Sequence, residues 1–374
     1  MGGYRRELPT ERWKRSSSRS AAALLRGRGD TRPVKTEQLP ALTAVRFVLA
    51  LWVILHHLTG AAAAPGLLPH PVYALIRGGY LAVTTFFVLS GFVLAGSYGA
   101  QEWNSERLRR YAAGRFARIY PVYALSLVLV APFVIADRTP GKSAYLAAYG
   151  LLLQGWTGHL PVGWNTPAWS LSCEVFFYAC FPLAVAMLRR VNPAALAVVA
   201  CVLTRALFLV GVRDEWKPLV HLADFVMGIA ASGMYLRLRG RMAGHWLYIP
   251  SAALGVALIV WPQVLPSGLD LNTALRPLNA ALLVGLALGA PALSAPWAVY
   301  LGKSSYAMYI LHVPVLWWVR RWWPHMPAGV YVTLVILISA AVYRYFEEPA
   351  NRYLRGARPR RASPAQISYS TASP

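Results

Sequence analysis

The first long apolar segment of the chain, residues 42–62, carries two side chains that could do chemistry. Arg46 and His57 lie in it eleven residues apart, about three helical turns and roughly 16 Å of rise, so both share one face of a helix. Basic side chains in such a helix usually face a protein-lined or hydrated cavity, and imidazole is the side chain best suited to general base catalysis near neutral pH. We therefore expect His57 to be catalytic. The alternatives are that Arg46 extends to the cytosolic membrane surface and that His57 bonds a neighbouring helix.

A carboxylate occurs in the later segment WSLSCEVFFYACFPL. Glu174 lies about one turn inside the predicted outer end of a helix over 169–188, where an unpaired charge is costly. Since His57 is expected at a compatible depth, we predict a Glu174–His57 pair in which the carboxylate holds the tautomer of the imidazole. A purely structural ion pair is the alternative. Trp169 and Ser170 precede Glu174 and are candidate substrate-binding residues.

Two arginines form an RxxR pair in the segment RFARIYP, before a predicted helix over 119–136. Arg115 and Arg118 would lie on one face of a helical turn, and guanidinium groups bind phosphate in a bidentate manner. The stretch 99–118 reads as a cytosolic loop, the side of the membrane where phosphorylated cofactors occur. The alternative is that these arginines only set the membrane topology.

Small and aromatic residues in two further segments are candidates for binding a substrate. Ser90 lies in FFVLSGF, where small residues also let helices approach closely. Tyr306, Tyr309 and His312 lie in LGKSSYAMYILHVPV at spacings that we expect to place them on one helix face. These side chains, or Ser305, could line an acceptor pocket or donate to an oxyanion. The sequence shows no metal-binding pattern, and its cysteines form no disulfide framework.

The elements that must position these residues are apolar helices. Of 374 residues, 57% are hydrophobic and only 14% are charged, with a mean hydropathy of +0.43; a soluble domain would carry about 25% charged residues. Apolar runs long enough to cross a bilayer recur along the chain. We predict an all-α, polytopic membrane helix bundle with about ten transmembrane helices, at residues 42–62, 78–98, 119–136, 169–188, 193–211, 218–236, 246–264, 274–292, 303–320 and 329–347.

Two segments need separate treatment. Residues 143–156 are apolar but too short to span comfortably, and we expect an interfacial or re-entrant segment. Pro349 follows the last predicted helix as a stop signal. We divide the chain into a disordered basic cytosolic tail (1–41), a membrane domain (42–347) and a basic cytosolic tail (348–374).

The formal net charge of +23 follows from topology rather than from binding of nucleic acid. With the N-terminus inside, the predicted cytosolic segments hold 25 Lys and Arg residues and the outer loops hold 7. This asymmetry fits the positive-inside rule and predicts a multi-pass protein of the plasma membrane with both termini in the cytosol.

Taken together and in order, the motifs around Arg46, His57, FFVLSGF, RFARIYP, WSLSCEVFFYACFPL and LGKSSYAMYILHVPV resemble the acyltransferase-3 family of integral membrane acyltransferases. The resemblance covers nearly all of residues 40–350. Arg46 and His57 match the arginine and histidine of that family, and Arg115 and Arg118 match its RxxR pair. The family carries two adjacent acidic residues where this chain has Glu174 and then Val175.

The resemblance implies a ten-helix enzyme that moves an acyl group, often acetyl, from cytosolic acyl-CoA to a hydroxyl. Acceptors in the family are usually sugars of envelope polysaccharides or glycosylated natural products. We expect acyl-CoA to be a co-substrate, with no permanently bound cofactor, and we expect Arg46, Arg115 and Arg118 to bind it. His57 would act as the base, oriented by Glu174.

Three alternatives remain open from the sequence. The acyl group could pass through an acyl-enzyme on His57 or Ser90. The protein could instead be a transporter or flippase of glycolipids or acylated metabolites, which also needs buried charges, or it could be a catalytically silent scaffold.

Overall fold

The computed structural model describes residues 39–59, 68–136, 142–158, 164–188, 190–212 and 215–356, and all regular secondary structure in these residues is helical. The N-terminal tail up to residue 38 and residues 357–374 of the C-terminal tail lie outside the described residues. The α-helices are α2 (Pro40–Thr59), α3 (His70–Arg77), α4 (Leu81–Tyr98), α5 (Ser105–Ala136), α6 (Lys142–Gly150), α7 (Trp169–Leu188), α8 (Pro193–Leu209), α9 (Lys217–Val220), α10 (Leu222–Leu238), α11 (His245–Val260), α12 (Leu271–Leu288), α13 (Pro296–Trp322), α14 (Ala328–Val342) and α15 (Glu348–Leu354).

Each of the ten predicted segments falls on one of these helices, so the all-α fold is confirmed. Seven helical stretches among the described residues are long and apolar enough to cross a membrane, and α8 and α11 are shorter apolar helices. The count of ten spans stays a prediction. Polar caps mark two helix starts, because the Asn192 side chain accepts a hydrogen bond from the backbone of Ala194 and Asp270 does so from Thr273.

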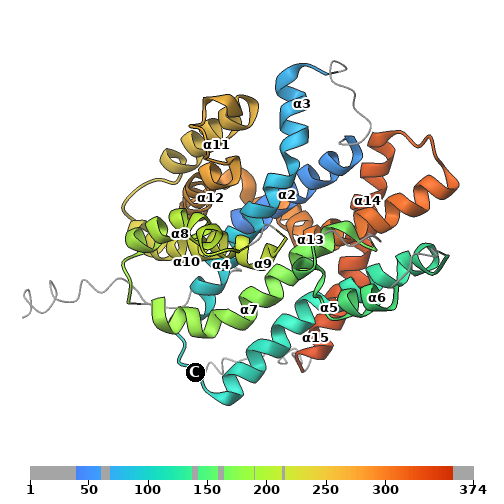
Figure 1. Ribbon diagram of the computed structural model, residues 1–374, viewed down its shortest axis with the longest axis horizontal. Coiled ribbons are helices and arrows are strands. Elements are labelled where there is room, and N and C mark those ends of the chain that lie inside the picture. Colours follow the sequence, from blue (N-terminus) through green and yellow to red (C-terminus); the bar gives the residue numbers. More distant parts are fainter. Residues whose placement is uncertain are drawn as a thin grey trace, which may run out of the picture.

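The centre of the molecule is built from α2, α4, α10 and α13 (Figure 1). In α4 and α10, Gly91 and Gly228 face each other. A Cβ on Gly91 would lie 2.1 Å from the carbonyl oxygen of Phe225, and one on Gly228 would lie 2.0 Å from that of Val88. The backbones therefore touch, as small residues permit between helices in membranes. The same holds for α13 and α2, where a Cβ on Gly302 would lie 1.9 Å from the carbonyl oxygen of Thr43.

A buried ion pair joins α10, α12 and α8 beside this centre. Arg276 and Asp224 are 2% and 0% exposed, and the Arg276 Nε donates to Asp224 Oδ1 at 2.6 Å. The remaining guanidinium nitrogens donate to the Ala200 carbonyl and the Thr204 hydroxyl, both at 3.0 Å. His221 contacts the other oxygen of Asp224 at 2.8 Å. Since each charged group here has a partner, Asp224 has a structural role as one half of a buried ion pair.

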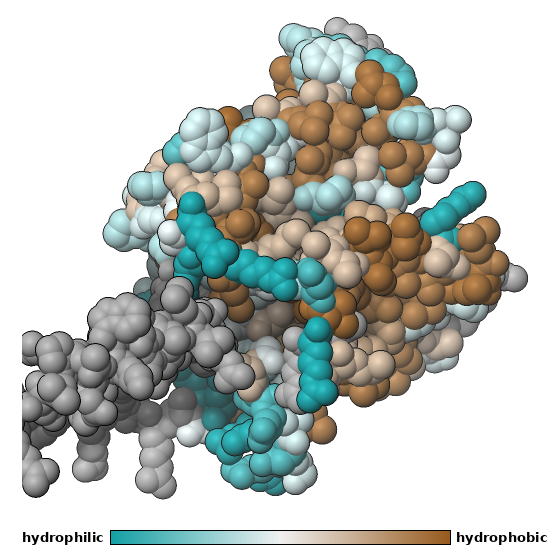
Figure 2. Space-filling model, turned by 90° about the vertical axis from the view of Figure 1, so that its left-hand side faces the viewer, coloured by the Kyte–Doolittle hydropathy of each residue, from teal (hydrophilic) through white to brown (hydrophobic). Residues whose placement is uncertain are grey.

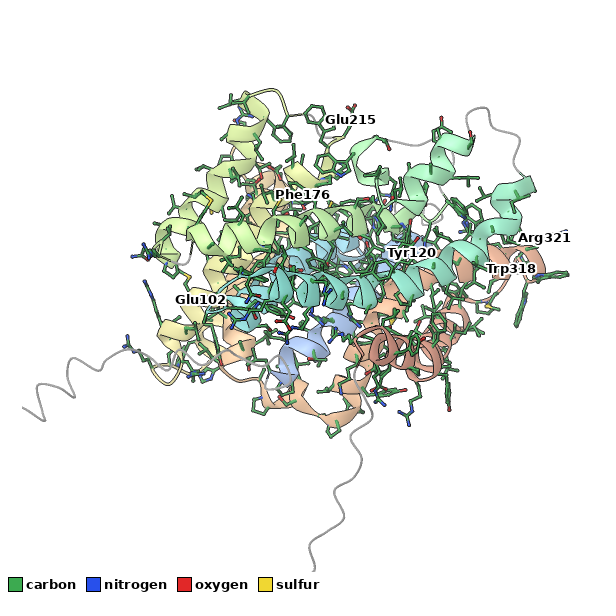
Figure 3. The ribbon with its side chains drawn as sticks, turned by 90° about the horizontal axis from the view of Figure 1, so that it is seen from below. Glu102, Tyr120, Phe176, Glu215, Trp318 and Arg321 are labelled. Carbon is green, nitrogen blue, oxygen red and sulfur yellow. The ribbon has the colours of Figure 1, made fainter. Side chains whose placement is uncertain are left out.

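The segment predicted as a cytosolic loop over 99–118 is in large part helix. α5 starts at Ser105 and continues without a break to Ala136 (Figure 3, from the side of Glu102 past Tyr120). Its start is capped by the Asn104 side chain, which accepts from the backbone of Arg107, and Glu106 pairs with Arg110 one turn later at 2.8 Å. The many arginines of residues 105–118 favoured a loop prediction, because only the apolar run after them looked like a membrane helix. As a result the RxxR pair stands on a rigid helix.

The prediction that Pro349 stops the last helix is wrong. α14 passes through one π-helical turn, η7 (Tyr343–Glu347), directly into α15. Pro349 follows the π-helical turn after one residue, and a π turn can accommodate such an interruption of the hydrogen-bond pattern within a helix. The π turn shifts the helical register and brings α15 alongside α5 (Figure 1).

The short apolar segment 143–156 does not form a spanning helix. It folds as α6 and the 3₁₀ turn η3 (Gln154–Trp156), which pack against α5 and α7. The Tyr123 hydroxyl donates to the Tyr149 carbonyl at 2.6 Å, and the Gln154 amide donates to the Ala168 carbonyl at 2.7 Å. The expectation of a non-spanning segment agrees with this structure.

Apolar side chains also cover the outside of the bundle. Figure 2 shows a broad area of brown, apolar side chains on one face of the molecule. Leu183 on α7 and Val198 and Leu209 on α8 are 64–76% exposed. In water such a surface would drive association, whereas lipid chains would cover it.

Replacing Gly228 with alanine should lower the thermal unfolding midpoint of the protein purified in detergent. The new methyl group would collide with the backbone of α4, and overpacking of this kind costs about 1–3 kcal/mol. Gly329→Ala is the control, because nothing lies within 4 Å of its Cβ position. An unchanged midpoint in Gly228→Ala would contradict the close packing of α4 on α10.

Candidate active site

A cavity of about 790 Å³ lies among α2, α4, α5, α7, α13 and the η7–α15 segment. We call it the basic cavity, because six basic side chains line it against three acidic ones: Arg46, Arg115, Arg118, Lys303, Arg352, Arg355, Glu174, Glu347 and Glu348. Hydroxyl groups of serines and tyrosines complete its polar lining: Ser90, Ser97, Ser170, Ser305, Tyr98, Tyr178, Tyr306, Tyr309 and Tyr343. Most predicted site residues are therefore brought together here.

Arg118 is held by a carboxylate from the far end of the chain. It forms an ion pair and hydrogen bond with Glu347, whose side chain is 2% exposed. The Arg118 guanidinium also lies 5.2 Å from the ring centroid of Tyr306, a distance typical of cation–π contacts. Glu347 could not be recognised from the sequence, because an acid just before a predicted helix end is expected at the membrane surface. Only the continuation of the helix through η7 turns it inward.

Arg115 lies in an aromatic environment instead. Its guanidinium carbon is 5.6–5.8 Å from the ring centroids of Tyr98, Tyr111 and Tyr178. It donates one long hydrogen bond, 3.5 Å, to the Tyr98 hydroxyl, and its Nε atom is buried without a partner. The two members of the RxxR pair thus differ: the charge of Arg118 is neutralised, and that of Arg115 is available to an anion.

Glu174 belongs to the basic cavity rather than to His57. It accepts a hydrogen bond from Tyr178, one turn along α7, and its charge interacts with those of Arg46, Arg115 and Arg118. Among the hydrogen bonds of the described residues, none joins Glu174 to His57. The prediction of a Glu174–His57 pair is therefore wrong.

The reason lies at the start of α7. Asn165 is fully buried, and its side-chain amide donates to the Ser126 hydroxyl at 2.9 Å and to the Ile310 carbonyl at 3.0 Å. The helix thus begins inside the protein, so one turn from its start is not one turn from the membrane surface. Glu174 is carried to the depth of Arg46, three turns from His57.

His57 lines a second cavity of about 620 Å³, which we call the His57 cavity. Its walls come from the C-terminal end of α2, from α3 and η2 (Gly78–Tyr80), and from α11, η5 (Pro262–Val264) and α12. The lining residues are His56, His57, Ala74, Arg77, Gly78, Tyr80, Ile259, Pro262 and Leu271. This lining mixes apolar side chains with an aromatic ring and a few polar groups, as binding sites for small organic molecules do.

His57 is bound to His312 of α13, at a distance of 3.1 Å between Nδ1 of His57 and Nε2 of His312. The other nitrogen of His312, Nδ1, lies 2.7 Å from the Tyr309 carbonyl oxygen. A carbonyl can only accept, so Nδ1 of His312 carries its hydrogen and Nε2 of the neutral ring accepts. Nδ1 of His57 therefore donates, both to His312 and to the Val53 carbonyl at 3.1 Å. This leaves Nε2 of His57 with a free lone pair, the arrangement that a general base needs.

The residues of α13 do not all share one face. Tyr306 and Tyr309 line the basic cavity, where their hydroxyls donate to the Ile119 carbonyl at 2.6 Å and the Pro167 carbonyl at 3.0 Å. His312 is 0% exposed and lies behind them. Each step of three residues turns the side chain back by about 60° around the helix. Two such steps carry His312 out of the cavity lining and towards α2, so the prediction of one shared face is wrong.

Of three other residues predicted to bind substrate, two line the basic cavity and one does not. Ser90 and Ser170 line the basic cavity, and the Ser170 hydroxyl lies 2.8 Å from that of Tyr309. Trp169 instead stacks in a cluster of rings, with centroids 5.4 Å from His221 and 6.1 Å from Phe87. Val175 is 40% exposed on the outside of α7, so the position where the resembled family has its second acid points away from the cavity.

The fold and the site define a multi-pass membrane helix bundle that encloses a basic cavity and a histidine pair. Residues 39–344 match the family model described as acyltransferase domain. The chain thus belongs to the acyltransferase-3 family, as its motifs predicted. Acyl transfer is the reaction class that the family and the relatives below support.

The relatives include the acyltransferase MdmB of Streptomyces mycarofaciens, 29% identical over 89% of this chain and 96% of its own length. Protein 2 in the picA locus of Rhizobium radiobacter is 33% identical over 27% of this chain and 64% of its own length. A candidate O-acetyltransferase of Staphylococcus aureus is 21% identical over 86% of this chain, which spans only 59% of that relative. No solved structure matches the chain.

Breaking the Arg118–Glu347 pair should destabilise the protein strongly. Removing one partner of a buried ion pair leaves an uncompensated charge and costs about 3–5 kcal/mol. We expect this in a double-mutant cycle measured by thermal or denaturant unfolding. The double variant Arg118→Ala/Glu347→Ala should lose far less free energy of unfolding than the two single variants lose in sum. The exposed pair Arg110–Glu106 is the control, with an expected coupling of about 0.3–0.5 kcal/mol. Equal coupling energies in the two cycles would contradict the buried pairing.

Proposed function

We propose that this protein transfers an acyl group, acetyl in the first instance, from acyl-CoA to a hydroxyl of a carbohydrate or glycosylated acceptor. The observation that carries the proposal is that Tyr309 of the basic cavity lies one helical turn from His312, and that His312 contacts His57, whose Nε2 has a free lone pair. The family and the relatives support acyl transfer. The donor, the acceptor and the roles of the residues are our inference.

The basic cavity fits the donor in size and charge. Its volume of about 790 Å³ is in the range of sites for cofactor-sized molecules. The six basic side chains exceed the three acidic ones, so the cavity has a positive charge that favours an anionic ligand. The three phosphates of CoA would supply it, with the Arg115 end of the cavity taking them and Arg46 stabilising charge deeper inside.

The acyl group would reach His57 along α13. Tyr309 lines the basic cavity, and His312 follows one turn later in direct contact with His57. The ring centroids of Tyr309 and His312 are 6.2 Å apart, and those of Tyr309 and Phe86 are 5.9 Å apart. A pantetheine arm that passes these two rings would bring its thioester to the imidazole.

The chemistry needs one base and one leaving group. Nε2 of His57 takes the proton from the acceptor hydroxyl as its oxygen attacks the thioester carbonyl. The C–S bond then breaks, the new C–O ester bond remains on the acceptor, and the CoA thiolate leaves with the proton from His57. His312 would accept the hydrogen bond from Nδ1 throughout, so it keeps the reactive tautomer and shares the positive charge that develops on His57.

The His57 cavity would hold the acceptor. Tyr80 offers a half-exposed aromatic ring for stacking on a sugar, and Arg77 and His56 offer hydrogen bonds. The name of the Staphylococcus aureus relative, an O-acetyltransferase, agrees with a hydroxyl acceptor. Because the His57 cavity lies at the end of α2 opposite to Arg46, the acceptor would enter from the outer side of the plasma membrane. Both termini would then be cytosolic.

Glu174 takes a different role from the one its sequence suggested. We infer that it offsets part of the arginine charge and holds Tyr178 in the cavity wall. Ser90 also contacts Tyr178 rather than a histidine, which favours direct transfer over an acyl-enzyme at Ser90, since a serine nucleophile needs an adjacent base.

Replacing His57 with alanine should lower kcat for transfer from acetyl-CoA by about 10²–10⁴-fold, the usual contribution of a general base. The KM for acetyl-CoA should change little, because the donor binds in the other cavity. Purified protein in detergent, radiolabelled acetyl-CoA and a panel of glycoside acceptors provide the assay. His245→Ala, at an exposed histidine, is the control. If His57→Ala transfers at the normal rate, the proposed base is wrong.

His312→Phe should lower kcat by roughly tenfold or more and shift the pH profile of kcat, since Nδ1 of His57 loses an acceptor. His312→Gln should recover part of the rate, because its amide oxygen can accept the same hydrogen bond. A merely structural role would lower the stability of both variants and leave the pH profile unmoved. That result would remove His312 from the mechanism.

A further inference from the structure

The end of α15 brings an additional arginine to the basic cavity. Arg355 follows Leu354 directly and lines the cavity together with Arg115. Its Nη2 atom lies 3.4 Å from the carbonyl oxygen of Gly114, the residue before Arg115. The side chains of Arg115, on α5, and Arg355, after α15, therefore both line the wall formed by these two helices.

The two glutamates of the η7–α15 segment form ion pairs with other arginines. Glu347 pairs with Arg118. Glu348 pairs with Arg352 at 2.5 Å and Arg344 at 3.6 Å. In the described part of the chain, neither Arg115 nor Arg355 has an ion pair of its own.

The two free guanidinium groups affect each other. Partial burial and the charge of Arg115 lower the pKa of Arg355. Arg115 has one long hydrogen bond and a buried Nε atom without a partner. Arg355 is exposed, so an anion from solvent can reach both arginines, and arginine donors match the oxygens of phosphate in geometry.

We propose that Arg115 and Arg355 form a phosphate-binding pair at the mouth of the basic cavity and hold a phosphate of the acyl-CoA donor. This rests on the proposed function. It assigns a binding role to the end of α15, and it excludes Arg118 from direct phosphate binding. The Arg118–Glu347 pair instead fixes α5 against the η7–α15 segment and so sets the spacing of the two phosphate-binding arginines.

Comparing a donor with phosphates and one without them tests the pair. Arg355→Ala should raise the KM for acetyl-CoA by about tenfold or more, the scale of one lost charge-assisted hydrogen bond. The KM for acetyl-pantetheine, which has no phosphate, should stay unchanged, and so should kcat for both donors. Arg355→Lys should recover part of the loss. The assay uses purified full-length protein in detergent without anionic lipid, so that lipid phosphate cannot contribute.

Arg110→Ala is the matched control. It removes the same charge from α5 at a site paired with Glu106 outside the cavity lining, and the KM for acetyl-CoA should stay unchanged. An equal rise in KM for both donors in Arg355→Ala, or an unchanged KM for acetyl-CoA, would overturn the phosphate-binding pair.

A binding measurement separates failure of this pair from failure of the proposed function. If the wild-type protein transfers no acyl group from either donor, the proposed function is wrong. The shift in the thermal unfolding midpoint on addition of CoA then tests the phosphate-binding pair by itself. Stabilisation of the wild type by CoA but not by pantetheine, lost in Arg355→Ala and kept in Arg110→Ala, would support the pair. The same stabilisation of wild type and Arg355→Ala would refute it.

Discussion

The placement of charged side chains inside an apolar helix bundle is the constraint on which the rest of this structure depends. Charges removed from water are costly unless they are paired, and two arrangements of charge in this protein differ in that respect. The Asp224–Arg276 pair is closed, because each of its charged groups has protein partners. The basic cavity is open, because its arginines and lysine outnumber its carboxylates. The first arrangement is complete within the protein, and the second is the place where we propose that the anionic donor binds.

The elements could be predicted well from sequence, because apolar length is a strong signal. Every predicted segment falls on a helix, and the short segment 143–156 does not span. The residues of the basic cavity were also largely foreseen, since charged side chains such as Arg46 and Glu174 are rare in an apolar run and usually mark a cavity or a pair. The chemical type of a side chain and its presence in an apolar run are local properties, so they can be recognised in a single sequence.

The pairing of these residues could not be predicted, because it depends on geometry that the apolar pattern does not encode. Glu174 was assigned to His57 by counting from a membrane boundary, but the buried Asn165 turn moves the start of α7 into the protein. Glu347 was missed because a single π-helical turn decides which way it points. His312 was placed beside Tyr309 in a pocket, although a rotation of about 60° per step along α13 directs it to α2.

The packing of α2 on α13 connects these observations. At one end Gly302 lets the backbones touch at Thr43, near the basic cavity, and at the other end His57 contacts His312. α2 therefore lines both cavities, and its spacing from α13 is fixed by backbone contact. Sites built on helices hold their geometry better than sites built on loops. The packing of α2 on α13 consequently sets the tautomer of His57, because it holds His57 against His312. A change that moved α2 away from α13 would break this contact, and it would also widen the path from the basic cavity to the imidazole.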